Sequence, residues 1–490
     1  MRSVISCVVL CVALCLTGCG VQSRAKTSDF NKLYEEGQYE EALKVATDGA
    51  ANATEASDPL LWNLHAGACY IAEDRFDNAI TIFDEAEAYC KQDDLENDAL
   101  KGAQTAGEIL TNRYLLDYDP TQYDKTFVNY YKALSFMALG DFDNSRVEWN
   151  RVYERQRMAV QEFEKEIAKT REEIEAEAEQ RVAEAQNATE ATNATAVEAE
   201  PDAEETDVDM DRMVEAAKAK MDEKSENHRA WKPYTDYVNP YPTYIGGIYW
   251  LAKGEDKGDY EKALDNFKRV KGMTECQLVD KDIEAATACL GKAGGKAAQK
   301  NVWVVFENGM GPELKEVRLD LPIFAVSQDS PIKTVSMALP YMAFRNKAYD
   351  YLEIEAGKAK DRTIQLADID RVVATEFDVY YDSILAKSIA STITKMLTQV
   401  VAEKTLGDTG ALIMGIFNSL TTQADTRMWT ALPKEVQVAR LPLPEDGHLL
   451  LKSPQGVVLS EIEIPDCNDC IVYVRIPKAN VPAAVATIPL

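Results

Sequence analysis

The sequence predicts an α+β protein with two differently built halves, an N-terminal α-helical solenoid and a C-terminal antiparallel β-rich domain with packed helices. Two observations lead to this prediction. One short motif recurs four times in the N-terminal half, and short apolar or alternating segments replace it after Asn301. The change of pattern places helical repeats at residues 29–180 and 229–298, and the β-rich domain at residues 299–490.

The recurring motif contains a Gly or Asp, an aromatic residue two positions later, and a small residue three positions after the aromatic. Its copies begin at Gly37, Asp74, Gly140 and Gly258. The first residue tolerates a tight turn, the ring packs beneath that turn, and the small residue lets two helices approach closely. The motif resembles the turn and second helix of a tetratricopeptide repeat, so we expect a tetratricopeptide-like solenoid whose concave surface binds protein. A generic helical bundle is the alternative.

An acidic segment interrupts the repeats. The helix of the third copy is expected to continue beyond Trp149 as a charged helix with a short apolar seam. Between Val182 and Asp211 there are ten acidic residues and no Lys or Arg. Such a composition cannot bury enough apolar surface to fold, so we expect residues 181–228 to form a disordered insertion. A short helix from Met210 to about Glu223 is expected near its end.

Strand patterns dominate the C-terminal half. Residues 302–306 form a continuous apolar run, and residues 316–321 alternate between polar and apolar side chains, as half-buried strands do. Further strands are expected at residues 349–354, 436–441, 462–464 and 471–476. A helical insertion is expected at about residues 376–420, because apolar residues recur at helical spacing from Leu385 to Val400 and a second helix follows at 411–420.

The chain is strongly acidic, with a formal net charge of -29. A protein that binds nucleic acid presents a basic face, so this charge excludes nucleic acid as an expected partner. It also argues against attachment to anionic lipid through charge alone.

The first residues have the features of an export signal. One Arg precedes the uncharged run from Val4 to Leu16, which is shorter than the roughly 20 residues that span a bilayer. The run ends at Leu16-Thr17-Gly18-Cys19, which resembles the lipobox of bacterial lipoproteins. This resemblance implies a signal peptide at residues 1–18, fatty acid such as palmitate on Cys19, and a lipidated linker at residues 19–28. Gly20 stands where such proteins carry Asp when they stay at the inner membrane, which favours the outer membrane, facing the periplasm.

The chain has ten cysteines. We expect three of them to be removed with the signal peptide and Cys19 to carry the lipid, so six remain. An even number permits disulfides in an exported protein. Cys276 and Cys289 form one expected pair, and Cys467 and Cys470 form the other. The spacing of Cys467 and Cys470 also occurs in redox proteins, but a strand rather than a helix is expected after it, which favours a local disulfide. With three His in the chain, we expect neither a metal nor another cofactor.

Separated pieces of the chain occur in the same order as in an uncharacterised family of bacterial lipoproteins. They are Asn129–Leu134, Asn239–Tyr241, Val304–Gly309, Leu339–Tyr341, Gln423–Trp429 and Leu432–Pro433. The chain resembles this family over residues 127–167 and 239–476, and the acidic insertion departs from its pattern. The resemblance implies N-terminal tetratricopeptide-like helices, a C-terminal β-rich domain and work in the cell envelope or cell wall, and it supplies no catalytic residues.

The candidate functional residues come from two of these pieces: Glu307, Asn308 and Gly309 in one, and Asp425, Arg427 and Trp429 in the other. Their carboxylate, amide, guanidinium and indole groups could line a ligand site. A buried Asp–Arg pair and a capped turn would explain the same residues without a ligand.

The expected function is that of a non-enzymatic scaffold in the bacterial cell envelope. It would bind one or more envelope proteins through its repeats and be held at the membrane by its lipid. One alternative is a module that binds glycan or lipid, which a deep pocket lined by Tyr and Trp would favour. A hydrolase has less support, because only His448 is available beside carboxylates in the β-rich domain.

Overall fold

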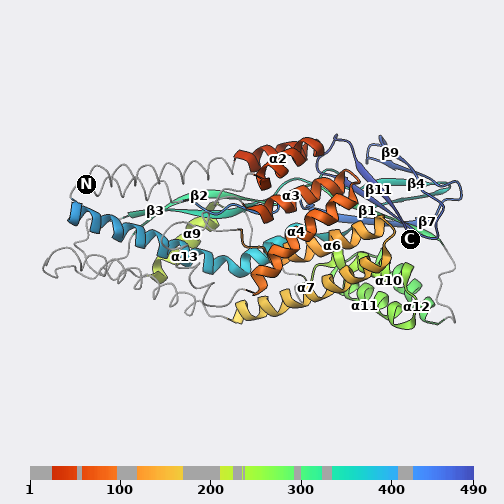
Figure 1. The fold of residues 1–490 in the computed structure, drawn as a ribbon, viewed down its shortest axis with the longest axis horizontal. Helices are drawn as coiled ribbons and strands as arrows, with labels where there is room; N and C mark the ends of the chain where they lie inside the picture. Colours follow the sequence, from red (N-terminus) through yellow and green to blue (C-terminus); the bar gives the residue numbers. More distant parts are fainter. Residues whose placement is uncertain are drawn as a thin grey trace.

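The structure is a computed structural model, and it describes residues 25–51, 58–95, 118–168, 210–224, 234, 238–291, 300–322, 334–406 and 423–490. The predicted signal peptide, Cys19, most of the acidic insertion and the helix expected at 411–420 lie outside these residues. The described residues form an elongated, mixed α+β fold in which helices cover one side of a sheet (Figure 1).

Helical hairpins make up the N-terminal half of the described chain. The helices are a segment at residues 25–35 and α2 (Tyr39–Ala51), α3 (Pro59–Ala72) and α4 (Phe76–Leu95), α6 (Gln122–Ala138) and α7 (Phe142–Ala168), α10 (Pro240–Lys253) and α11 (Lys257–Met273), and then α12 (Leu278–Leu290). The segment at 25–35 is helical where the end of a linker was expected.

The motif turns form as predicted at three of the four copies. Their first residues have positive φ angles: 72° at Gly37, 58° at Asp74 and 74° at Gly140. In each case the second helix begins at the motif aromatic. The fourth copy differs, because Asp256 caps α11 by accepting a hydrogen bond from the Asp259 N–H at 3.0 Å, which places Gly258 inside the helix.

Two glycines in the first helices allow the hairpins to close. A Cβ atom at Gly67 would lie 2.3 Å from the Phe83 ring, and a Cβ at Gly247 would lie 2.7 Å from the Phe267 ring. Both rings belong to the second helix of the same hairpin, at the position four residues after the small motif residue. The second and fourth hairpins therefore close on the same glycine–phenylalanine contact.

Two sheets lie on one side of the helices. The larger has the strand order β11 (Ala484–Pro489), β10 (Cys470–Ile476), β1 (Asn301–Asn308), β7 (Glu435–Pro442) and β6 (Ile364–Asp368). The smaller has the order β5 (Ala359–Arg362), β4 (Glu353–Ala356), β8 (His448–Lys452) and β9 (Val458–Glu463). Pairing is antiparallel as predicted, except that β1 and β10 run parallel; the long chain between these two strands makes that crossover possible.

The central strand β1 is buried on both faces, which explains its continuous apolar run. Trp303 and Val305 belong to the core shared with the helices. Val304 and Phe306 belong to a second core shared with β4, β8 and β9 of the smaller sheet. The helices, the larger sheet and the smaller sheet are therefore three successive layers.

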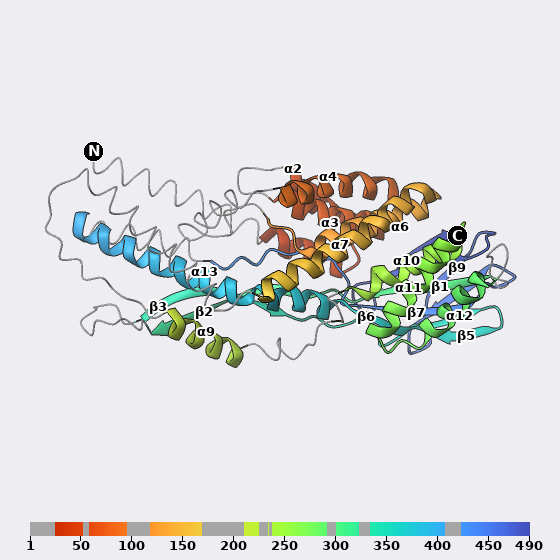
Figure 2. The same ribbon diagram turned by 90° about the horizontal axis from the view of Figure 1, so that it is seen from below.

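An arm extends away from these layers (Figures 1 and 2). It contains α9 (Met210–Lys224), the hairpin of β2 (Glu313–Pro322) and β3 (Thr334–Ala343), and α13 (Ile369–Leu406). Its core includes Met221, Leu339, Leu385 and Ile389. The predicted helical insertion is thus present, but it begins seven residues earlier than expected and packs on a strand pair.

The first helix of each hairpin after α2 is almost wholly buried. Residues 60–69 of α3, 123–135 of α6 and 240–251 of α10 are all buried, whereas α11 has only five buried residues. The second helix α11 is more exposed, whereas the first helices α6 and α10 contact the larger sheet through the hydrogen bonds of Tyr131 and Tyr241 to Glu307 of β1. The side of the helical layer that α6 and α10 form is therefore in contact with the protein's own sheet.

Candidate functional site

Glu307 lies on the helix-facing side of β1, at the centre of the contact between helices and sheet. Its Oε1 accepts hydrogen bonds from the hydroxyls of Tyr131 in α6 at 3.0 Å and Tyr241 in α10 at 2.9 Å. Its Oε2 accepts one from Tyr473 in β10 at 2.7 Å. The carboxylate thus joins two helices to two neighbouring strands.

Burial raises the pKa of Glu307, and the Arg475 charge together with the tyrosine hydroxyls opposes that rise. The Arg475 Nε lies 3.7 Å from Oε2. The same guanidinium donates to the backbone carbonyls of Glu307 at 3.2 Å, Gly309 at 2.5 Å and Ala431 at 3.2 Å. Glu307 is 1 % exposed, so its hydrogen-bonding capacity is used within the protein.

Asn308 and Gly309 hold the loop before β4. The Asn308 amide donates to the Tyr349 carbonyl at 2.7 Å, and its oxygen accepts from the N–H groups of Ala348 and Tyr349. Gly309 has a φ of 71°, and a Cβ there would lie 2.9 Å from backbone atoms of Asn346 and Lys347. Both residues therefore have a structural explanation.

The second candidate set fastens another contact. Arg427 donates to both oxygens of Asp425, at 2.9 and 2.8 Å, and to Asp58 just before α3 at 2.5 Å. Trp429 packs against the rings of Phe83 in α4 and Tyr131 in α6, with centroid distances of 5.9 and 5.8 Å. Arg427 and Asp58 are buried, whereas Asp425 is partly exposed, and Asp58 is a third partner that the sequence did not suggest.

Asp282 in α12 is a second buried carboxylate of the same kind, which the sequence analysis missed. It accepts hydrogen bonds from the Tyr244 hydroxyl at 2.7 Å, the Trp303 indole at 3.2 Å and the Arg440 guanidinium at 2.8 Å. These donors come from α10, β1 and β7. No local motif marks Asp282, because its partners are distant in the sequence.

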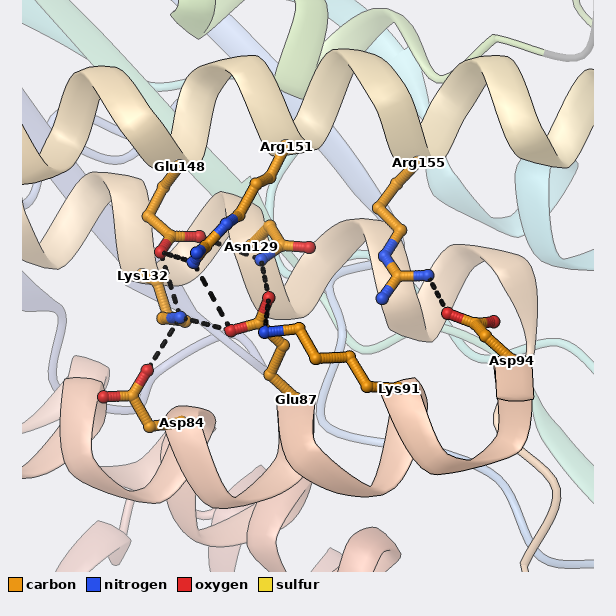
Figure 3. A network of polar contacts seen from close by, with 9 residues as sticks. All are labelled: Asp84, Glu87, Lys91, Asp94, Asn129, Lys132, Glu148, Arg151 and Arg155. Atoms are coloured by element: carbon orange, nitrogen blue, oxygen red, sulfur yellow. Dashed lines mark hydrogen bonds and ion pairs between the residues drawn. The ribbon is translucent and has the colours of Figure 1, made fainter. Parts of the chain in front are cut away.

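A charged network joins α4, α6 and α7 (Figure 3). Lys132 Nζ lies 2.7 Å from carboxylate oxygens of Asp84 and Glu87 and 3.0 Å from Glu148. Asn129 donates to Glu87 at 3.2 Å and to Glu148 at 2.8 Å. Burial would raise the pKa of Glu87, but the bonds from Lys132 and Asn129 hold it at about 2. The piece Asn129–Leu134 therefore carries contacts between helices.

The six cysteines of the described residues are free in the structure. The predicted pair Cys276–Cys289 is wrong, because Cys276 precedes α12 and Cys289 lies near its end. The helix from Leu278 to Cys289 alone is about 16 Å long at 1.5 Å per residue, beyond the reach of a disulfide. Cys467 and Cys470 are also unbonded, but their side chains contact each other. Burial raises the pKa of both thiols, unlike the lowered pKa of a redox-active thiol.

A small cavity lies between α6, α7, α13 and the residues Tyr234, Val238 and Asn239, with a volume of about 30 Å³. Glu376 of α13 lines it and accepts hydrogen bonds from the backbone N–H groups of Gln122 at 2.6 Å and Tyr123 at 3.1 Å. Burial raises the pKa of Glu376 to about 8, against the effect of these two bonds. No pattern in the sequence marks Glu376 as a candidate residue.

His65 and His448 do not lie beside the candidate carboxylates. His65 is fully buried in α3, and neither of its ring nitrogens has a hydrogen-bond partner in the described structure. His448 lies exposed on β8 of the smaller sheet, whereas Glu307 faces the helices on the other side of β1. The two groups are therefore not brought together.

Within the described ranges, no three His, Cys, Asp or Glu residues are grouped as metal ligands. No helix among these residues is both long and apolar enough to cross a membrane. Comparisons with protein families, with curated proteins and with solved structures find no match to this chain.

Proposed function

We propose that this protein is a lipid-anchored, non-enzymatic scaffold of the bacterial cell envelope. Tetratricopeptide-like helix pairs and the β-rich part form one rigid body, and the lipid on Cys19 holds it at the outer membrane, facing the periplasm. One observation carries the proposal. The side chains of Glu307, Asn308 and Arg427 all form hydrogen bonds to other residues of the protein. They build a platform for a partner.

The partner-binding surface is the outer side of the helical layer. The inner helices are covered by the sheet, but α4 and α7 carry five of the eight exposed large apolar side chains of the described residues: Tyr89, Leu95, Val147, Tyr153 and Met158. Single exposed apolar side chains are common on protein surfaces, and a contiguous patch is what marks a binding site, so these five positions are where we place the test for a partner. An envelope protein is the expected partner.

The alternative of a glycan- or lipid-binding module gains little from the cavity beside Glu376. Pockets for such ligands have volumes of roughly 300–1,000 Å³. A cavity of about 30 Å³ holds neither a sugar ring nor an acyl chain.

The test is crosslinking in living cells from a photoreactive residue at Tyr153, whose exposed fraction is 53 %. Glu461, exposed on β9, is the matched control position. We expect one envelope protein to be captured from position 153 and not from 461, and to be lost in Cys19→Ala. Capture of wall fragments or lipid alone, or equal capture from both positions, would contradict the scaffold.

A further inference from the structure

The cavity beside Glu376 has an acidic wall without a cation. Among the described residues, Glu376 forms no ion pair with Lys or Arg, and it accepts hydrogen bonds from the first two backbone N–H groups of α6. Lys125 lies nearby on α6, but its Nζ is held by Asp93 at 2.6 Å and Asp94 at 2.8 Å. A buried carboxylate with no cation beside it is a place where a bound cation gains a strong, charge-assisted hydrogen bond.

The other walls of the cavity also suit a bound cation. Tyr123, Phe163 and Tyr234 line the cavity, and the faces of aromatic rings attract cations. Arg371 of α13 already places its guanidinium carbon 3.9 Å from the centroid of the Tyr234 ring. This corner of the protein therefore shows the contact that a second cation would make.

Asn239 leaves a polar group in the cavity wall without a partner. Its Nδ2 is buried and has no hydrogen-bond partner among the described residues, although its oxygen caps α10 by accepting from the Tyr241 N–H at 3.1 Å. A water that accepts from Nδ2 can also accept a hydrogen bond from a cation beside it. The wall thus has a place for a hydrated guest.

We propose that this cavity binds the primary ammonium group at the end of an unbranched alkyl chain, with Glu376 as its counter-ion. The size suits the end of such a chain, because about 30 Å³ is room for an ammonium group and the methylene beside it. The cavity is partly open to solvent, so the rest of the alkyl chain would extend out of it. A lysine side chain of a partner protein and a free small amine present the same chemistry. The proposal goes beyond the scaffold function and does not depend on it.

The pH dependence follows from the groups around Glu376. Burial and, to a smaller extent, Asp124 on α6 raise its pKa, and Lys125 on α6 opposes that rise. Tyr234 lines the cavity, and Arg371 lies against the Tyr234 ring. Because the pKa of Glu376 is about 8, binding an ammonium group at neutral pH requires loss of a proton from the carboxyl. The affinity for an amine should therefore rise between pH 6 and pH 9, while the amine itself stays charged.

The test is titration of the full chain with n-propylammonium chloride by calorimetry, with n-propanol and sodium chloride as controls. We expect saturable binding of n-propylammonium only. Glu376→Gln should lower the affinity at least about tenfold, as loss of a charged hydrogen bond does. Glu164→Gln, on the exposed face of α7, should leave it unchanged.

A second variant keeps the test independent of folding. Ala159→Leu fills the cavity from α7 and leaves Glu376 in place, so it should also abolish binding. Circular dichroism checks that both variants fold. Binding of n-propanol as strong as that of the amine, unchanged affinity in both folded variants, or no saturable binding by the natural chain would overturn the proposal. Competition by a lysine-containing peptide would identify the side chain as the source of the ammonium.

Discussion

Glu307 shows at the scale of single residues how the candidate site is used. Three tyrosine hydroxyls from α6, α10 and β10 converge on one carboxylate that is closed off from solvent. Removing such an acceptor leaves buried donors without partners, which costs more than the hydrogen bonds themselves contribute. The residue therefore controls whether helices and sheet stay together.

Replacing Glu307 should test this role. Glu307→Ala leaves Arg475 and three hydroxyls buried without their acceptor, so we expect a loss of about 3–5 kcal/mol in the free energy of unfolding, measured in urea. Glu307→Gln keeps an acceptor oxygen and should lose less. The exposed control Glu461→Ala should change stability by less than about 0.5 kcal/mol. A loss in Glu307→Ala no larger than in the control would contradict the assigned role.

Gly140 and Gly309 have the same backbone conformation, so comparing their replacement by Ala distinguishes the cost of the positive φ angle from the cost of a steric clash. Gly309 and Gly140 have φ angles of 71° and 74°, but an added Cβ meets backbone atoms 2.9 Å away at Gly309 and nothing within 4 Å at Gly140. Gly140→Ala should cost about 1–2 kcal/mol for the left-handed conformation alone. Gly309→Ala should cost about 1–3 kcal/mol more. Equal losses in thermal unfolding would show that the loop at Asn346 yields.

His65 predicts a pH effect whose sign can be stated. Burial lowers its pKa to about 3, with a further contribution from the Arg345 charge. Its stabilising contribution is therefore complete above the usual pKa near 6.5 and is lost progressively as the pH falls toward 3. His65→Leu, which removes two unpartnered nitrogens, should be at least as stable at pH 7 and should lose less stability than the natural chain between pH 6.5 and pH 4.5. An equal loss over that interval would mean that other groups cause it.

At the scale of elements, the charged network gives a direct test of how α4, α6 and α7 are joined (Figure 3). Lys132→Met leaves Glu87 and Glu148 buried without the central cation, and we expect a loss of about 3–5 kcal/mol in the free energy of unfolding. Lys91 also pairs with Glu87, at 3.1 Å, but it is half-exposed. Lys91→Met should therefore cost less than about 1 kcal/mol. Similar losses of unfolding free energy in Lys132→Met and Lys91→Met would contradict the account, because they would mean that Lys132 contributes no more than an exposed ion pair.

The sequence predicts elements well where one local pattern determines them. The motif turns at Gly37, Asp74 and Gly140 and the fully apolar strand β1 are confirmed. Strands β3, β5, β6, β8 and β11 were not predicted. In β3, Pro340 interrupts an apolar run, and β5 is short and largely exposed, so neither shows a strand pattern.

The candidate site was predictable as a set of residues but not as an arrangement. Glu307 and Arg427 were singled out, but their partners Tyr473 and Asp58 are far away in the chain. Glu376 had no signal at all, because its raised pKa arises from burial between helices that no local pattern brings together. The predicted strand at 349–354 begins only at Glu353, because Asn308 holds the preceding residues in a loop.

At the scale of the whole molecule, the helices, the larger sheet and the smaller sheet share cores in succession. Hydrogen bonds to Glu307 and Asp282 connect the helices to the larger sheet. Arg427, in the segment before β7, binds Asp58 at the start of α3. The chain should therefore unfold as one unit in these layers, although its helical and strand-rich halves differ in pattern.

Hydrogen exchange followed by mass spectrometry tests this central claim most directly. We expect α6, α10, β1 and β10 to show the same free energy of opening, and to lose protection together in Glu307→Ala. Opening of α6 and α10 at a clearly lower free energy than β1 and β10 in the natural chain would contradict the account, because it would mean that helices and sheet are separate domains in contact.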